Sequence, residues 1–195
     1  MRRSFEAIVL AAGSGSRFGG GKLVSDFGGA PLIEGALAAA FAAPARCVTV
    51  VLGADDRVEE AALAFARRWG ESRRLTLVYA PDHAEGLSAS LRAGLQAAGD
   101  CHAAFVFLGD MPRIPHDLLD PLAEAVDKGA LAAAPICNGR RGHPAVLSAA
   151  LFDQLCQVSG DQGARAVLDA LGDRLTLLPT EDDGVLFDVD LPHQA

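Results

Sequence analysis

A glycine-rich loop with two cationic side chains follows the first apolar segment of the chain. Residues 7–12 are all apolar. The glycines that follow them are Gly13, Gly15, Gly19, Gly20 and Gly21. Glycines allow successive backbone N–H groups to turn toward one anion, and Arg17 and Lys22 add positive charge to the same loop. This pattern predicts a phosphate-binding loop at the end of a buried strand.

Two familiar phosphate-binding motifs do not fit this loop. A dinucleotide-binding fingerprint that begins at Gly13 requires its third glycine where Phe18 stands. A P-loop that ends at Lys22 requires glycine in place of Ser16 and a hydroxyl residue in place of Leu23. The loop therefore belongs to another class of nucleotide-binding sequence.

Lys22 is one of only two lysines among 17 basic residues, the other being Lys128. Lysine carries a compact and mobile point charge, whereas the planar fork of arginine suits fixed bidentate contacts. We therefore interpret Lys22 as a catalytic contact to a triphosphate. The alternative is an ordinary solvated loop lysine.

A carboxylate follows a second apolar segment. Residues 105–108 read as a buried strand, Asp110 comes two residues later, and Pro112 stops further strand pairing. Magnesium binds one or two carboxylates together with phosphate oxygens and water. Asp110 is thus a candidate metal ligand, and a turn or capping aspartate is the alternative.

The C-terminal region repeats this arrangement. An apolar strand is predicted over 185–188, and Asp188 and Asp190 stand two residues apart at its end. Side chains with this spacing lie on the same face of a strand. One of them is a candidate second metal ligand, with Asp190 slightly favoured. The alternative is a pair of acids that protects a sheet edge by charge.

Two further polar segments could bind substrate groups. Ser88 and Ser90 stand at the start of a predicted helix, where hydroxyls and free N–H groups can meet a base or a phosphate, or can simply cap the helix. Arg140, Arg141 and His143 gather two guanidinium groups and an imidazole in an acidic protein. That cluster suits a second anionic substrate, although a solvated turn with a packed histidine fits the same residues.

Short apolar runs alternate with helical patterns along the chain, which predicts an α/β domain with a mainly parallel sheet. The predicted strands are 6–12, 46–53, 74–80, 103–109, 130–136, 143–148, 174–179 and 185–188. The predicted helices are 31–43, 55–69, 87–98, 116–128, 148–157 and 163–171. Ligands of such sheets bind beyond the carboxyl ends of the strands, where these polar segments fall.

Composition limits the class of protein. A length of 195 residues with 50% hydrophobic residues predicts a single domain over residues 1–195. A net charge of −8 argues against nucleic-acid binding. Neither a run of about 20 apolar residues nor a signal-peptide core is found, so we expect a cytoplasmic protein that does not bind membranes. Cys47, Cys101, Cys137 and Cys156 are dispersed, as expected of reduced packing residues.

The first loop resembles the signature Leu-Ala-Ala-Gly-x-x-x-Arg-x-Gly-x-x-Lys of nucleotidyltransferases. The matching residues are Leu10, Ala11, Ala12, Gly13, Arg17, Gly19 and Lys22. Residues 139–144 and 160–165 resemble Gly-x-x-Gly-His-Pro and Gly-Asp-x-Gly-Ala-Arg of the molybdenum cofactor cytidylyltransferase branch of the MobA-like NTP transferase superfamily. Residues 188–192 are similar to its Asp-Ile-Asp-Thr-Pro, with Leu191 in place of threonine and without the usual following helix.

This resemblance implies a three-layer α/β/α fold of the Rossmann-like nucleotidyltransferase type. It implies transfer of CMP from CTP to the terminal phosphate of molybdopterin, with release of pyrophosphate and without a protein nucleophile. The pair Ala11-Ala12 resembles the CTP-using branch, whereas the guanylyltransferase branch tends to have Ala-Gly-Gly. A molybdenum hydroxylase, or the chaperone that inserts its cofactor, is the implied protein partner.

The resemblance and the residues together assign roles. Catalytic roles fall to Arg17, Lys22 and Asp110. The nucleotide-binding residues are Leu10, Ala11, Ala12, Gly13, Gly15, Lys22 and Ser88. The acceptor-binding residues are Arg140, Arg141 and His143, and Mg²⁺ is expected on Asp110 with Asp188 or Asp190.

Two other functions fit the same residues. A related nucleotidyltransferase could use GTP, or could act on a sugar phosphate or another small phosphorylated acceptor. A nucleotide-binding module without catalytic activity would bind CTP and release no pyrophosphate with any acceptor.

Overall fold

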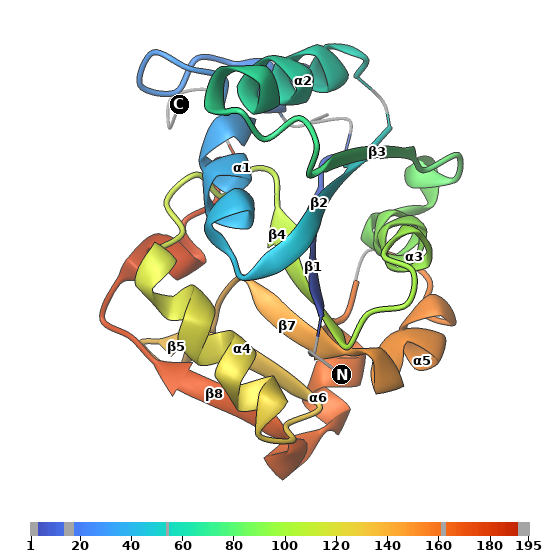
Figure 1. Ribbon diagram of the computed structural model, residues 1–195, viewed down its shortest axis with the longest axis vertical. Helices are drawn as coiled ribbons and strands as arrows, with labels where there is room; N and C mark the ends of the chain where they lie inside the picture. The colour runs from blue at the N-terminus through green and yellow to red at the C-terminus, as the bar shows by residue number, and fades with distance from the viewer. Residues whose placement is uncertain (1–3, 14–17, 54, 161–162, 191–195) are drawn as a thin grey trace.

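Apolar strands of the chain assemble into one sheet with helices on both faces (Figure 1). The computed structural model describes residues 4–13, 18–53, 55–160 and 163–190. Its strands are β1 (Phe5–Leu10), β2 (Ala45–Leu52), β3 (Leu75–Tyr79), β4 (Ala103–Leu108), β5 (Ala132–Cys137), β6 (Arg140–Arg141), β7 (Ala145–Ser148) and β8 (Leu175–Pro179). They lie in the order β3-β2-β1-β4-β7-β5-β6, with β8 paired to β5. The sheet is mainly parallel, because only β6 and β7 pair antiparallel to their neighbours.

Two apolar cores form on the two faces of the sheet. One core contains residues of α1 (Ile33–Ala42), α2 (Arg57–Trp69) and α4 (Leu119–Asp127). The other contains residues of α3 (Leu87–Ala97), α5 (Phe152–Cys156) and α6 (Arg165–Ala170). Figure 1 shows α3 and α5 on the side of the sheet away from α1 and α4. The predicted three-layer α/β/α architecture is therefore confirmed.

The register of β1 with its neighbours sets the position of the loops that follow. Leu10 at the end of β1 is paired with Val51 of β2 and with Leu108 of β4. Beyond the ladder, the Gly109 N–H donates to the Leu10 carbonyl at 3.0 Å, and the Ala11 N–H donates to the Val51 carbonyl at 3.0 Å. The loops after β1 and β4 therefore leave the sheet side by side at its carboxyl edge.

The structure corrects one predicted strand. Residues 185–188 do not pair in the sheet; a 3₁₀ turn spans Asp183–Leu186 instead. The Asp182 carboxylate accepts the Gly184 N–H at 2.8 Å, which turns the chain. A Cβ at Gly184 would lie 2.0 Å from the Arg113 carbonyl oxygen, so the turn packs closely against the segment after β4. These contacts place Val185 in the interior without strand pairing.

Three predicted helices also differ in detail. The start of the one predicted over 116–128 is a 3₁₀ turn over His116–Leu118, and α4 follows it. The helix predicted over 148–157 likewise begins with a 3₁₀ turn, and the one predicted over 163–171 is shortened to α6. The strand β6 was not predicted, because its two residues carry no apolar pattern. Within the described part of the chain, no helix is long and apolar enough to cross a membrane.

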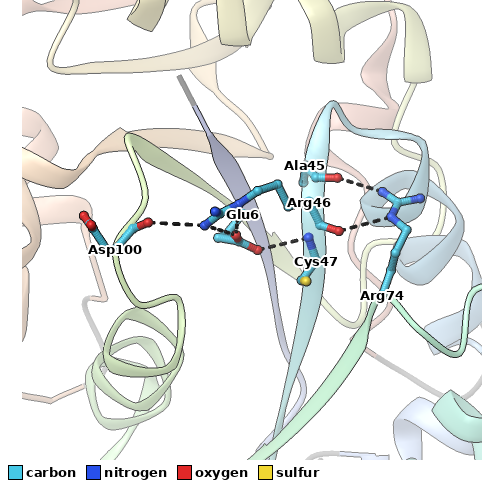
Figure 2. A network of polar contacts seen from close by, with 6 residues as sticks. All are labelled: Glu6, Ala45, Arg46, Cys47, Arg74 and Asp100. Atoms are coloured by element: carbon cyan, nitrogen blue, oxygen red, sulfur yellow. Dashed lines mark hydrogen bonds and ion pairs between the residues drawn. The ribbon is translucent and has the colours of Figure 1, made fainter. Parts of the chain in front are cut away.

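A polar network closes the amino end of the sheet (Figure 2). The β1–β2 register shifts between Phe5 and Ala7, and Glu6, which is only 5% exposed, lies at this shift. Its carboxylate accepts the Cys47 N–H at 3.0 Å and the Arg46 Nε–H at 2.8 Å. The Arg46 guanidinium also donates to the Asp100 carbonyl at 3.2 Å. Glu6 thus satisfies a backbone group that the irregular ladder leaves unpaired.

Candidate active site

A cavity of about 560 Å³ opens at the carboxyl edge of the sheet. The loop after β1, the end of β4 and the start of α3 form its walls. The lining residues are Leu10, Ala12, Gly13, Lys22, Leu23, His83, Ala84, Gly86, Leu87, Ser90, Leu108 and Asp110. We refer to it as the first cavity. Several predicted nucleotide-binding residues therefore share one hollow with Lys22 and Asp110.

Lys22 joins two distant acids at this cavity. Its Nζ lies 2.7 Å from Asp110 Oδ2 and 3.4 Å from Asp190 Oδ1. The Lys22 side chain is 11% exposed, so the ammonium is largely removed from water. Its backbone is held by a 3₁₀ turn, in which the Lys22 carbonyl accepts the Ser25 hydroxyl at 2.7 Å and buried Leu23 anchors the turn. A fixed backbone therefore carries a mobile ammonium to the carboxylates.

Residues 185–190 reach the cavity through a backbone contact. The Val189 N–H donates to the Asp110 carbonyl at 3.1 Å, and the Val189 side chain is completely buried. This contact holds Asp188 and Asp190 near Asp110. Burial, followed by the neighbouring carboxylates of Asp190 and Asp110, raises the pKa of Asp188 above its usual value. Three acids thus share a small region in which Lys22 supplies the ammonium.

The donor set fits a divalent ion that arrives with a nucleotide. The described residues contain no group of three His, Cys, Asp or Glu side chains arranged to hold a metal by themselves. However, the Asp110 and Asp190 carboxylates converge on one cationic group, Lys22 Nζ. Magnesium uses one or two carboxylates when phosphate oxygens and water complete its shell. Asp190 meets this requirement with Asp110, and Asp188 lies beside them.

The loop after β1 presents its predicted residues unequally. Leu10, Ala12 and Gly13 line the first cavity, whereas Ala11 is buried and does not. A Cβ at Gly53 would lie 2.4 Å from the Ala12 carbonyl oxygen, so the chain after β2 supports the loop from behind. The predicted residues Gly15 and Arg17 lie outside the residues that the structure describes.

The serines of α3 differ from the prediction. Ser90 lines the first cavity, whereas Ser88 is only 1% exposed and is absent from its wall. The Ser88 Oγ is buried without a hydrogen-bond partner among the described atoms. Positions two apart on a helix point in nearly opposite directions, so only one of the two serines faces the ligand side. Ser90 is therefore the serine that lines the first cavity.

Sequence reasoning also missed His83. It lines the first cavity, and its Nδ1 lies 3.0 Å from the Ala80 carbonyl oxygen. Its ring packs edge-to-face on Tyr79, with the ring centroids 6.2 Å apart. The signal was available, because His83 follows β3 at the same sheet edge as the other polar segments.

A second cavity of about 750 Å³ adjoins the first. The two share Leu10, Leu87 and Leu108 as a common wall. Arg140, Arg141 and His143, which we predicted for an acceptor, all line the second cavity. The structure adds two charged residues of α6, Arg165 and Asp169. The second cavity is therefore rich in guanidinium groups.

Asp169 orients one of these guanidinium groups. Arg141 Nη1 donates to Asp169 Oδ1 at 2.6 Å, and the Arg141 side chain is 22% exposed. Arg165 lies one helical turn before Asp169, and both face the second cavity. The sequence analysis assigned no role to Arg165, although it stands in the Gly-Asp-x-Gly-Ala-Arg segment, and Asp169 carried no sequence signal.

His143 contributes a neutral ring to the second cavity. Its burial lowers the pKa of the imidazole below 6.5, so the ring is uncharged at neutral pH. Its Nδ1 is buried without a hydrogen-bond partner among the described atoms. The backbone N–H of His143 donates to the Val185 carbonyl at 2.9 Å. Residues 185–190 therefore contact both cavities, at His143 and at Asp110.

A third hollow, of about 830 Å³, lies between α4 and β8. Its volume exceeds that of the first cavity, but its walls include Pro121, Ala125 and Leu178 and none of the predicted site residues. The exposed ion pair between Lys128 and Glu124 lies at its rim. Volume alone therefore does not identify the site, whereas the gathering of charged groups does.

Comparisons with known proteins match most of the chain. A model of the MobA-like NTP transferase domain matches residues 7–175. The molybdenum cofactor cytidylyltransferase of Escherichia coli strain K12 is 25% identical over 189 residues, which cover 97% of this chain and 92% of that protein.

Two solved structures extend the comparison. A protein of Mycobacterium sp. strain JC1, the homologue of a Mycobacterium tuberculosis protein, superposes with a TM-score of 0.81 at 28% identity, over 96% of this chain and 90% of that one. A nucleotidyl transferase of Methanothermobacter gives a TM-score of 0.74 at 25% identity, over 96% of this chain and 92% of that one. The fold of this chain thus has counterparts among solved structures, one of which is a nucleotidyl transferase.

Proposed function

Because the chain belongs to the family of the MobA-like NTP transferase domain, we propose that it transfers CMP from CTP to the terminal phosphate of molybdopterin and releases pyrophosphate. The family makes the chain a nucleotidyltransferase, and the resemblance inferred from the sequence motifs is confirmed. The likeness to the E. coli cytidylyltransferase supports the choice of CTP and of this acceptor.

One observation carries the proposal: two cavities with different chemistry share a wall. The first holds the ammonium of Lys22 and the carboxylate of Asp110. The second holds several guanidinium groups. A transferase needs two anionic substrates beside each other, and positioning alone contributes a large part of such catalysis. The shared wall at Leu10, Leu87 and Leu108 supports this use of the two cavities.

The first cavity is the proposed nucleotide site. The backbone at Gly13 and the ammonium of Lys22 would contact the triphosphate, with Arg17 and Gly15 in the same loop. The Ser90 hydroxyl takes the place that we had predicted for Ser88. Positive groups aimed at the β- and γ-phosphates stabilise the charge that develops on the leaving pyrophosphate.

Asp110 and Asp190 would hold Mg²⁺ in this site. The bound ion would neutralise phosphate oxygens and polarise the α-phosphorus. The chain itself keeps the two carboxylates together through the Val189 N–H and the Asp110 carbonyl. Asp188 supplies further negative charge beside them.

The second cavity is the proposed acceptor site. Arg140, Arg141 and Arg165 would bind the anionic groups of the acceptor, and neutral His143 leaves their positive charge unchanged. The acceptor phosphate is already ionised at neutral pH, so no general base is required. Its oxygen bonds to the α-phosphorus while the bond to the bridging oxygen of pyrophosphate breaks. This direct displacement requires no protein nucleophile.

Pyrophosphate release tests the proposal. Purified protein with Mg²⁺ and a molybdopterin-type acceptor is offered CTP and GTP in parallel, with Asp110→Ala as the blank. Release with CTP alone is the expected result. Release with GTP alone would identify GTP as the nucleotide substrate. No release with either nucleotide would contradict the proposed acceptor or the proposed reaction.

A further inference from the structure

One ammonium group holds the acids that are proposed to bind metal. Lys22 Nζ lies 2.7 Å from Asp110 Oδ2 and 3.4 Å from Asp190 Oδ1. These are the oxygens that a divalent ion would use. A cation already in contact with both carboxylates competes with any second cation for the same electron pairs.

We propose that Lys22 is a built-in counter-ion that keeps free divalent metal out of the site until a nucleotide arrives. The inference rests on the proposed function, because it assigns the order in which nucleotide and metal enter that site. Lys22 thereby acts twice, first on the carboxylates and then on the phosphates. The first role is independent of any reaction.

The anchoring of Lys22 permits such a transfer. Its backbone is fixed by the Ser25 hydroxyl and the Ser25 N–H, which both donate to the Lys22 carbonyl. Leu23 beside it is buried. The four-carbon side chain can therefore swing while the turn stays in place. An arginine fork would be tied to one bidentate geometry.

The charges around the ammonium explain why a nucleotide releases it. The carboxylates of Asp110 and Asp190 both contact the Lys22 ammonium, and Asp188 lies beside them, so more than one acid retains Lys22. A triphosphate in the first cavity would bring several negative charges on one group, whereas each carboxylate carries one. Once the ammonium turns toward it, Asp110 and Asp190 become available to an ion that the phosphates also attract.

Binding of Mn²⁺ in the absence of nucleotide tests the proposal. Mn²⁺ replaces Mg²⁺ as the probe, because the electron paramagnetic resonance signal of free Mn²⁺ reports the unbound ion. We expect Lys22→Met to bind Mn²⁺ about tenfold more tightly than the wild type, the size of one lost charge-assisted contact. The matched control is Lys128→Met, which removes the only other lysine, an exposed one, and should leave the affinity unchanged.

Two further variants locate the effect. Adding Asp190→Asn to Lys22→Met should remove most of the gain in affinity, because the freed carboxylate is then missing. Lys22→Gln offers the same comparison if Lys22→Met does not fold, as judged by circular dichroism. Equal or weaker Mn²⁺ binding by the folded neutral variant would overturn the proposal.

The outcome is separable from the proposed function. A gain in metal affinity for Lys22→Met together with no pyrophosphate release by the wild type would leave the counter-ion role intact and contradict the assigned reaction. Pyrophosphate release by the wild type without any gain in metal affinity would contradict the counter-ion role alone.

Discussion

Two groups of acids and bases lie at opposite ends of the central strands, and they are balanced differently. At the amino end, both oxygens of one buried carboxylate, Glu6, accept N–H groups from Cys47 and Arg46 (Figure 2). At the carboxyl end, three carboxylates gather around the single ammonium of Lys22. Each oxygen of Glu6 accepts its own donor in the first group, whereas in the second, among the described contacts, one ammonium is shared by Asp110 and Asp190.

This difference separates a structural cluster from the one that we propose to be functional. A buried carboxylate with all its hydrogen bonds made stabilises the fold and has no capacity for a ligand. Crowded carboxylates repel one another, and the raised pKa of Asp188 records that repulsion together with burial. A cation that arrives with a ligand reduces the repulsion among these carboxylates. We therefore expect substitutions at the two ends to affect different properties.

The largest expected effect is on activity at the carboxyl end. Asp110→Asn should lower pyrophosphate release by about 10³-fold, because a group that stabilises transition-state charge is removed. Thermal unfolding should change little, since the substitution reduces repulsion among the acids. Asp117→Asn, at an exposed position in the 3₁₀ turn before α4, serves as the control. Unchanged turnover in Asp110→Asn would remove Asp110 from the metal site.

The second effect is on stability at the amino end. Glu6→Gln should lower the free energy of unfolding by about 2–3 kcal/mol, because an amide cannot accept both the Arg46 and the Cys47 N–H groups. Urea unfolding measures the change. The control is Glu124→Gln, which replaces an exposed acid and should lower the free energy of unfolding by less than about 0.5 kcal/mol. Loss of turnover in a Glu6→Gln variant that still folds would contradict the purely structural role of Glu6.

A third effect concerns the second cavity. Arg165→Ala should raise the KM for the acceptor about tenfold, which is the contribution of one charged contact. The KM for CTP should stay the same, since Arg165 lines the second cavity and not the first. Arg67→Ala on the exposed end of α2 is the matched control. A rise in the KM for CTP instead would indicate that the second cavity binds the nucleotide.

The smallest expected effect is a pH dependence at His143. Burial lowers its pKa in the folded state, so the unfolded chain binds a proton more readily below pH 6.5. Wild-type stability should therefore fall as the pH decreases from 7.5 to about 5.5. His143→Gln lacks this proton uptake, so the stability difference between the two proteins should shift against the wild type at low pH. Urea unfolding at several pH values measures this difference, and a constant difference would contradict it.

The sequence was sufficient for the parts of the site that local patterns determine. β1 and β4 are neighbouring parallel strands, so the loop carrying Lys22 and the residue Asp110 had to emerge at one edge. Their apolar runs and the residues that end them are contiguous in the chain. The remaining polar segments were recognised through the family resemblance, because they follow one another along the chain as they do in the family.

Other features depend on contacts between distant residues, which no local pattern records. Residues 185–188 have an apolar strand pattern, yet the turn at Asp183–Leu186 packs on Arg113 through Gly184 and accepts the His143 backbone N–H at Val185. Whether Ser90 or Ser88 lines the first cavity depends on which side of the first turn of α3 faces the sheet. The β1–β2 irregularity that engages Glu6 depends on pairing between strands that are 34 residues apart, from Leu10 to Ala45.

The two backbone contacts of residues 185–190 make this segment a spacer between the two cavities. Val185 is bound to His143 at the wall of the second cavity, and Val189 is bound to Asp110 at the first. The number of residues between these anchors therefore sets how far apart the two cavity walls can be held. Insertion of one glycine between Leu186 and Phe187 would leave every charged group in the chain, yet it would change the distance over which an oxygen of one substrate must reach the phosphorus of the other.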